Sequence, residues 1–131
     1  MSVIVTDTGF APAPDRLLPG PADLDGAAEV DLANTDDPEA LRPHLARLTL
    51  VRVAFPAFAD GRGFTLGRRL RAMGYRGRLL ALGPVIADQY PMLRRLGFDG
   101  AEIPEDLAAR PPPAQWATGP APRAYQSRLR A

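Results

Sequence analysis

The residue types best suited to chemistry lie together in residues 55–64. This stretch reads Phe-Pro-Ala-Phe-Ala-Asp-Gly-Arg-Gly-Phe and joins an apolar segment to an amphipathic one. Glycines let the backbone approach a ligand closely, and a helix N-terminus attracts anions. The stretch therefore predicts a small-anion site in which Gly61, Arg62 and Gly63 form the clamp.

A second polar loop, containing Asp88 and Gln89, follows the next apolar segment of the chain. Loops that follow parallel strands share one edge of a sheet, where α/β folds bind their ligands. Gln89 is therefore a further anion-binding candidate, and Asp60 and Asp88 are candidates for catalytic proton transfer. The alternative interpretation is structural, because both aspartates lie where carboxylates cap helices and Arg62 can pair with either.

The composition of the 131-residue chain excludes several kinds of catalysis. Cysteine and lysine are absent, which excludes thiolate nucleophiles, cysteine-ligated clusters and lysine Schiff bases. The single histidine, His44, excludes a histidine-based triad and a multi-histidine metal site. No glycine-rich nucleotide fingerprint is present. We therefore expect neither a metal nor a cofactor.

The charges are distributed unevenly, although the net charge is only +1. That small value argues against a nucleic-acid partner. Residues 61–87 contain no acid but six arginines, at positions 62, 68, 69, 71, 76 and 78. Arg68, Arg69 and Arg71, together with Trp116, are candidates for partner binding, and the alternative is a solvated helix face. No segment has the length and apolar character of a membrane span or leader, so we expect a cytoplasmic protein without a membrane partner.

The elements that must position these residues alternate along the chain. Short apolar segments at residues 29–32, 49–55, 78–82 and 101–103 predict strands, and helical patterns lie between them, at about residues 36–48, 62–73 and 86–96. Successive βα units predict a small α/β domain with a mainly parallel sheet and two or three layers. The core is expected over residues 28–109. An irregular N-terminal arm with room for one short strand (1–27) and a proline-rich C-terminal arm (110–131) extend from it.

An internal repeat supports this alternation. Residues 70–77 and 93–100 match in a leucine, two glycines and the aromatic residue between the glycines. Each copy predicts a helix that ends at a glycine in the left-handed conformation, Gly74 or Gly97, followed by an aromatic that folds back onto the last turn. Two identical exit turns favour a parallel sheet.

Residues 55–65, 70–77, 87–89 and 94–99 together resemble domain-of-unknown-function family 934, a bacterial family labelled as oxidoreductases involved in sulfite reduction. The resemblance extends over about residues 50 to 103. It implies a place in assimilatory sulfite reduction, beside a sulfite or nitrite reductase. Members often have Gly-Asp at Gly83-Pro84 and cysteine at Leu96. These departures argue against a thiol in the family's mechanism.

Three functions follow from the sequence. The leading hypothesis is an auxiliary protein of sulfur assimilation that binds sulfite, a related small anion, or the reductase itself. The first alternative is a small enzyme that uses Asp60 and Asp88 as an acid–base pair on an anionic metabolite. The second is a non-catalytic interaction module that binds through Trp116 and the proline-rich tail. The family label suggests an oxidoreductase, but the sequence contains no redox motif, so it leaves open whether the protein is an enzyme.

Overall fold

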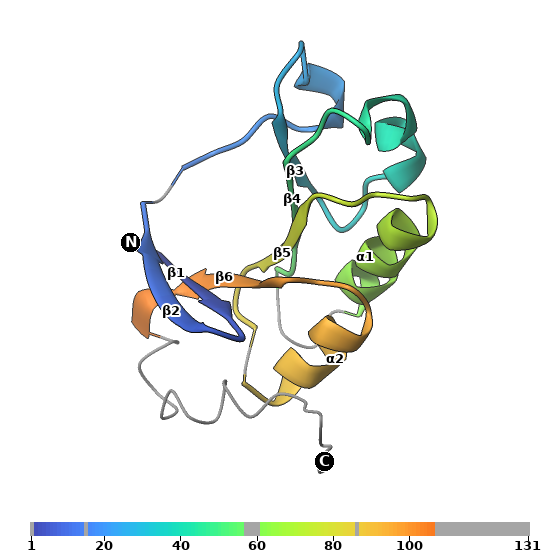
Figure 1. The fold of residues 1–131 in the computed structure, drawn as a ribbon. Helices are drawn as coiled ribbons and strands as arrows, with labels where there is room; N and C mark the ends of the chain where they lie inside the picture. Colours follow the sequence, from blue (N-terminus) through green and yellow to red (C-terminus); the bar gives the residue numbers. More distant parts are fainter. Residues whose placement is uncertain (1, 15, 57–60, 86, 107–131) are drawn as a thin grey trace.

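The computed structural model describes residues 2–14, 16–56, 61–85 and 87–106 (Figure 1). The strands in these ranges are β1 (Ser2–Thr6), β2 (Gly9–Ala13), β3 (Glu29–Leu32), β4 (Leu50–Ala54), β5 (Arg78–Leu82) and β6 (Gly100–Pro104). The helices are α1 (Arg62–Ala72) and α2 (Tyr90–Arg95), with short 3-10 helices η1 (Pro21–Asp23), η2 (Pro38–His44) and η3 (Ala87–Gln89).

All six strands join one sheet in the order β2-β1-β6-β5-β4-β3. Strands β3, β4, β5 and β6 are mutually parallel, which confirms the predicted α/β fold with its mainly parallel sheet. Strand β1 pairs antiparallel with both β6 and β2. Residues 2–13 therefore form a two-stranded hairpin, where the sequence indicated room for one short strand. Pro12 is tolerated in β2 because this strand lies at the sheet edge.

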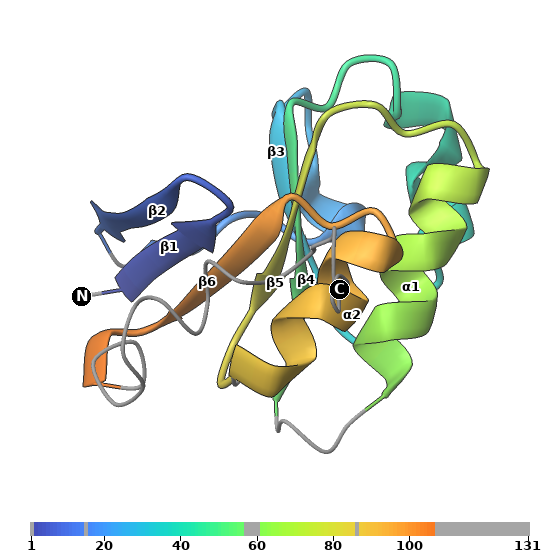
Figure 2. The same cartoon turned by 60° about the horizontal axis from the view of Figure 1, so that its bottom comes forward.

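The helices η2, α1 and α2 cover one face of the sheet, so the fold has two layers (Figures 1 and 2). The apolar core lies between these layers. It includes Val30, Leu32, Val51, Val53, Leu79, Ala81, Ala101 and Ile103 from the strands, with Leu41, Leu66, Leu70, Tyr90 and Leu93 from the helices. In the described part of the chain, no helix has the length and apolar character needed to cross a membrane.

The two predicted exit turns are both present. Gly74 and Gly97 have φ angles of 104° and 101°, in the left-handed region that favours glycine. After Gly74, the Tyr75 amide donates to the Leu70 carbonyl at 3.0 Å, and after Gly97 an equivalent 3.0 Å bond joins the next aromatic residue to α2. Tyr75 and its counterpart Phe98 are buried. The repeated motif thus fixes how both helices lead into the next strand.

The segment before β4 differs from its prediction. The sequence favoured a helix to about Leu48, whereas the 3-10 helix η2 ends at His44. Pro43 lies inside it and has no N–H to donate to a preceding carbonyl, which interferes with regular α-helical hydrogen bonding. The start of the helix follows the prediction, because the Asp37 carboxylate accepts from the Glu39 amide at 2.9 Å.

Gly67 of α1 packs against Phe98, which lies in the exit turn after α2. A Cβ atom at this position would overlap the ring of the buried Phe98. We expect Gly67→Ala to lower the free energy of unfolding by about 1–2 kcal/mol, because overpacking outweighs the better helix propensity of alanine. Urea denaturation followed by circular dichroism measures this. In a double-mutant cycle with Phe98→Leu, the two losses should be less than additive, and additive losses would contradict the proposed overlap.

Candidate functional site

The loops that the sequence analysis singled out follow β4 and β5 at the carboxyl edge of the sheet (Figure 2). The backbones at the start of these loops are in contact. The Phe55 amide donates to the Leu82 carbonyl at 2.8 Å, and a Cβ atom on Gly83 would overlap the Phe55 carbonyl. Because Gly83 also has a φ of 137°, a side chain there would be strained for two reasons. The structure therefore places the described starts of both loops on one edge.

The start of α1 is the part of the predicted anion clamp that the structure describes. Gly61 is the N-cap residue, and its helix has no acidic side chain in the first turn. Arg62 is exposed, while Gly63 is buried beneath Phe55, whose ring atom Cζ would lie 2.6 Å from an added Cβ. Packing alone thus explains why residue 63 is glycine. Asp60 lies outside the described residues.

The second loop forms the 3-10 helix η3, which contains Asp88 and Gln89. Asp88 is exposed and Gln89 is half-buried. The acid–base alternative calls for a carboxylate whose pKa is raised by burial or by the charge of the other carboxylate. Asp88 is not buried, and its partner Asp60 lies outside the described residues.

The six arginines between residues 61 and 87 do not form one surface. Arg68 and Arg69 are exposed on α1, and the Arg69 guanidinium lies 3.8 Å from carboxylates of both Asp37 and Glu39. Arg71, which the sequence analysis placed on the outer side of this helix, instead packs over Tyr75, with the guanidinium carbon 5.4 Å from the ring centroid. Trp116, the remaining partner-binding candidate, lies outside the described residues.

Arg71 connects the two exit turns. Its Nε donates to the Gly97 carbonyl at 2.8 Å, and its NH1 donates to the carbonyls of Tyr75 and Gly77 at 2.9 and 2.8 Å. Its NH2 donates to Asp99 at 3.1 Å. A side chain with these partners stabilises the protein's own turns, so it contributes little to a docking surface.

The sequence analysis missed a buried ionic cluster on the sheet face opposite α1 and α2. Arg52 of β4 is only 1 % exposed. Its Nε and NH2 donate to Asp31 of β3 at 2.6 and 2.7 Å, and its NH1 donates to both carboxylate oxygens of Glu102 of β6 at 3.1 and 3.0 Å. NH2 also donates to the Arg16 carbonyl at 2.9 Å. These contacts use all five donors of the guanidinium.

The Arg52 cluster is structural. Burial disfavours the charged guanidinium, but the hydrogen bonds and charges of Asp31 and Glu102 outweigh it and raise the pKa of Arg52 above its ordinary value. Asp31 also accepts from the Leu18 amide at 3.2 Å. The cluster thus fastens the segment that leaves the hairpin to the centre of the sheet, and no donor of Arg52 is left for a ligand.

The opposite, amino-terminal edge of the parallel strands contains a second concentration of charge, which we call the arginine pocket. It has a volume of about 460 Å³ and lies where the β1–β2 turn meets the starts of β5 and β6. Its lining consists of Thr6, Asp7, Thr8, Arg71, Arg76, Gly77, Arg78, Arg94 and Asp99. No group of three or more potential metal-binding side chains occurs among the described residues.

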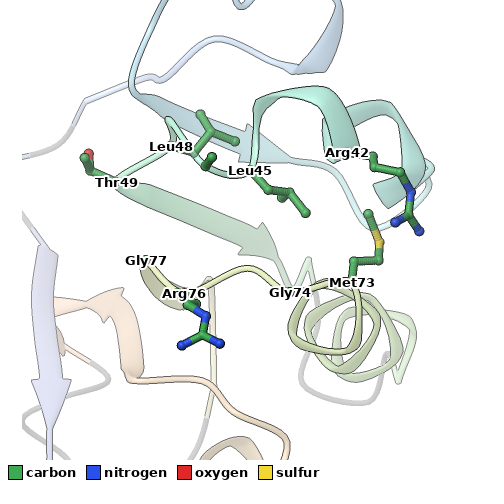
Figure 3. Close-up of a pocket in the computed structure, with 9 residues that line it drawn as sticks. Arg42, Leu45, Leu48, Thr49, Met73, Gly74, Arg76 and Gly77 are labelled. Atoms are coloured by element: carbon green, nitrogen blue, oxygen red, sulfur yellow. The ribbon is translucent and has the colours of Figure 1, made fainter.

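A larger hollow, of about 740 Å³, adjoins the arginine pocket, and Arg76 and Gly77 line both. Leu45 and Met73 lie on its opposite walls, one from the segment after η2 and the other from the end of α1 (Figure 3). Its remaining lining residues are Arg42, Ala46, Leu48, Thr49 and Gly74. The hollow therefore combines apolar walls with an arginine at each side.

Of three comparisons with known proteins, one gave a match. Neither the curated proteins nor the solved structures gave a match to the chain. A family model described as a bacterial protein of unknown function matches residues 29–131, which include strands β3 to β6 and both α-helices. This match confirms the resemblance seen in residues 50 to 103. The chain belongs to this bacterial family of unknown function, DUF934.

Proposed function

We propose that this protein is a cytoplasmic auxiliary protein of assimilatory sulfite reduction that binds a small anion such as sulfite. The observation that carries the anion proposal is the start of α1. Its first turn combines a glycine N-cap, an exposed Arg62 and no acidic side chain, so the helix itself supplies nothing to neutralise its positive end. The link to sulfur rests on the resemblance to a family with that label.

Sulfite titration by calorimetry tests the anion site. We expect wild-type protein to bind sulfite and Arg62→Ala to bind at least about tenfold more weakly, because a charge-assisted contact is lost. Arg95→Ala removes the same charge from an exposed position of α2 and serves as the matched control. Equal heats for wild type and Arg62→Ala, or no heat from either, would contradict the proposal.

The place in metabolism has its own test. A strain that lacks this gene should fail to grow with sulfate as its sulfur source and should grow normally on cysteine. The wild-type gene should restore growth on sulfate. Normal growth of the deletion strain on sulfate would remove the sulfur-assimilation role, whatever the protein binds.

Docking on the sulfite or nitrite reductase is the second candidate, and the exposure of Arg68 and Arg69 on α1 favours it. Tagged protein should capture the reductase from lysate, and Arg68→Glu with Arg69→Glu should abolish capture. Arg95→Glu tests whether a general loss of positive charge has the same effect. Arg71 is left unchanged because it connects the exit turns. Capture that survives the double reversal would rule out this surface.

The other two hypotheses have less support. The acid–base enzyme pairs Asp60 with Asp88, of which Asp88 is exposed and Asp60 lies outside the described residues. The interaction module depends on Trp116 and the proline-rich tail, which lie outside the described residues. Truncation after residue 110 tests it, because growth on sulfate should then be lost.

A further inference from the structure

The arginine pocket has more positive charge than its own carboxylates neutralise. Four of its lining residues are arginines and two are aspartates, a surplus of two positive charges. Asp7 pairs with Arg94, whose Nε lies 3.1 Å from Oδ2, and Asp99 pairs with Arg71 at 3.1 Å. The surplus therefore belongs to Arg76 and Arg78.

Arg76 and Arg78 flank Gly77 at the entry to β5, and both are exposed. Neither guanidinium forms an ion pair with any residue that the structure describes. Arg76 lines both the arginine pocket and the hollow, and in Figure 3 its side chain points away from Leu45 and Thr49. Two like charges in one pocket repel each other, and a bound anion would relieve this repulsion.

The walls around these two arginines are held in place by the fold. The Tyr90 hydroxyl donates to Asp7 at 2.6 Å, and the buried Tyr90 ring anchors the hairpin turn to α2. Burial, together with the Asp7 carboxylate, raises the pKa of Tyr90 above its ordinary value, so the phenol stays protonated as a donor. Asp99 likewise accepts from the Leu79 amide at 2.9 Å. The pocket is therefore largely formed before any ligand binds.

Hydroxyl groups complete the polar lining. The side-chain oxygens of Thr6 and Thr8 lie 2.9 Å apart at the β1–β2 turn, so their hydrogens can be shared or turned toward a ligand. Guanidinium groups match the oxygens of phosphate-like anions, and hydroxyls supply further donors. This set of donors suits an anion with three or four oxygens better than it suits a carboxylate.

We propose that the arginine pocket binds an oxyanion group that carries two negative charges, such as phosphate or sulfite, with Arg76 and Arg78 as its cationic partners. The site lies on the opposite edge of the sheet from Arg62 and does not rest on the function proposed above. The group can be a free ion or the end of an organic molecule. In the second case the adjoining hollow, with Leu45 and Met73, would hold the apolar body.

Calorimetry in an Arg62→Ala background tests the pocket separately from the start of α1. The probes are inorganic phosphate, sulfite and phenyl phosphate, at low ionic strength to limit screening. We expect measurable binding of at least one of them. Arg76→Ala and Arg78→Ala should each weaken that binding at least about tenfold, whereas Arg95→Ala should change it little. Amide chemical shifts of Thr8, Gly77 and Arg78 should move during the titration.

Met73→Ser separates the two sources of the oxyanion. If the ligand is organic, this change should weaken the binding of phenyl phosphate and leave the binding of inorganic phosphate unaffected. If it is a free ion, phenyl phosphate should bind no better than inorganic phosphate and Met73→Ser should have no effect. Either pattern supports the pocket.

The proposal is overturned if none of the probes binds to Arg62→Ala protein, or if Arg76→Ala and Arg78→Ala bind as the Arg95→Ala control does. If wild type binds sulfite and Arg62→Ala protein binds none of the three probes, the function proposed above is upheld and the pocket is overturned. Binding lost only in the Arg76 and Arg78 variants would do the reverse.

Discussion

Arg52→Met is expected to lower the free energy of unfolding by about 3–5 kcal/mol, the cost of breaking a buried ion pair by removing one partner. Methionine fills much of the volume of the arginine stem but cannot hydrogen-bond to Asp31 or Glu102. Glu102 is 5 % exposed, so its carboxylate would be left buried without the cation. Urea denaturation followed by far-ultraviolet circular dichroism measures the loss.

Two further variants separate this cause from a general effect of losing an arginine. Arg78→Met makes the same change at an exposed position of the neighbouring strand, and should cost less than about 0.5 kcal/mol. Adding Asp31→Asn and Glu102→Leu to Arg52→Met removes the stranded charges and should recover most of the loss. A loss below about 1 kcal/mol in Arg52→Met would show that the ion pairs do not hold this face together.

The strand–helix order and both exit turns could be predicted because they depend on residues close together in the sequence. Gly74 and Gly97 are each followed by an aromatic residue, whose amide donates to the carbonyl of the helix residue five positions before that aromatic. The hairpin was harder to predict. Strand β1 is fixed by pairing with β6, about a hundred residues later, as in the register of Val3 with Ile103. A short apolar segment among prolines and glycines gives little indication of such a distant partner.

The sequence contains an indication of the ionic cluster in the pattern of charged residues within two strands. Asp31 stands between Val30 and Leu32, and Arg52 stands between two valines, so each strand alternates apolar and charged residues. This alternation indicates a sheet with helices on one face only, rather than the continuous apolar strands of a sheet covered on both faces. The identity of the partners was beyond sequence reasoning, because Arg52 and Glu102 are 50 residues apart.

One of the two candidate sites could likewise be predicted from the sequence, and the other could not. The parallel strands bring the residues near Arg62 and the residues near Asp88 to one edge, as topology alone predicts. The arginine pocket could not be predicted, because Asp7 and Thr8 reach Arg76 and Arg78 only through the antiparallel pairing of β1 with β6. A run of arginines in the sequence therefore contains side chains with different roles, and only the structure separates them.

Arg71→Ala is the second large effect that we expect, a loss of about 2–3 kcal/mol in the free energy of unfolding. The change removes the donors to the carbonyls of Tyr75, Gly77 and Gly97, and so affects both exit turns at once. We place the loss below that of Arg52→Met because the Arg71 side chain is 24 % exposed, which lets water replace part of the lost hydrogen bonding.

Arg71→Lys distinguishes this structural role from the docking role that the sequence suggested. Lysine keeps the charge, but its single ammonium group cannot span the carbonyls and Asp99 as the guanidinium does, so it should recover only a small part of the stability. A docking residue would behave in the opposite way, with full stability in Arg71→Ala and capture of the reductase preserved in Arg71→Lys. Arg68→Ala, one helical turn away and exposed, should stay within about 0.5 kcal/mol of wild type in the same denaturation experiment. Equal stabilities of Arg71→Ala and Arg68→Ala would contradict the structural role of Arg71, because removing a side chain that connects two turns should lower the free energy of unfolding.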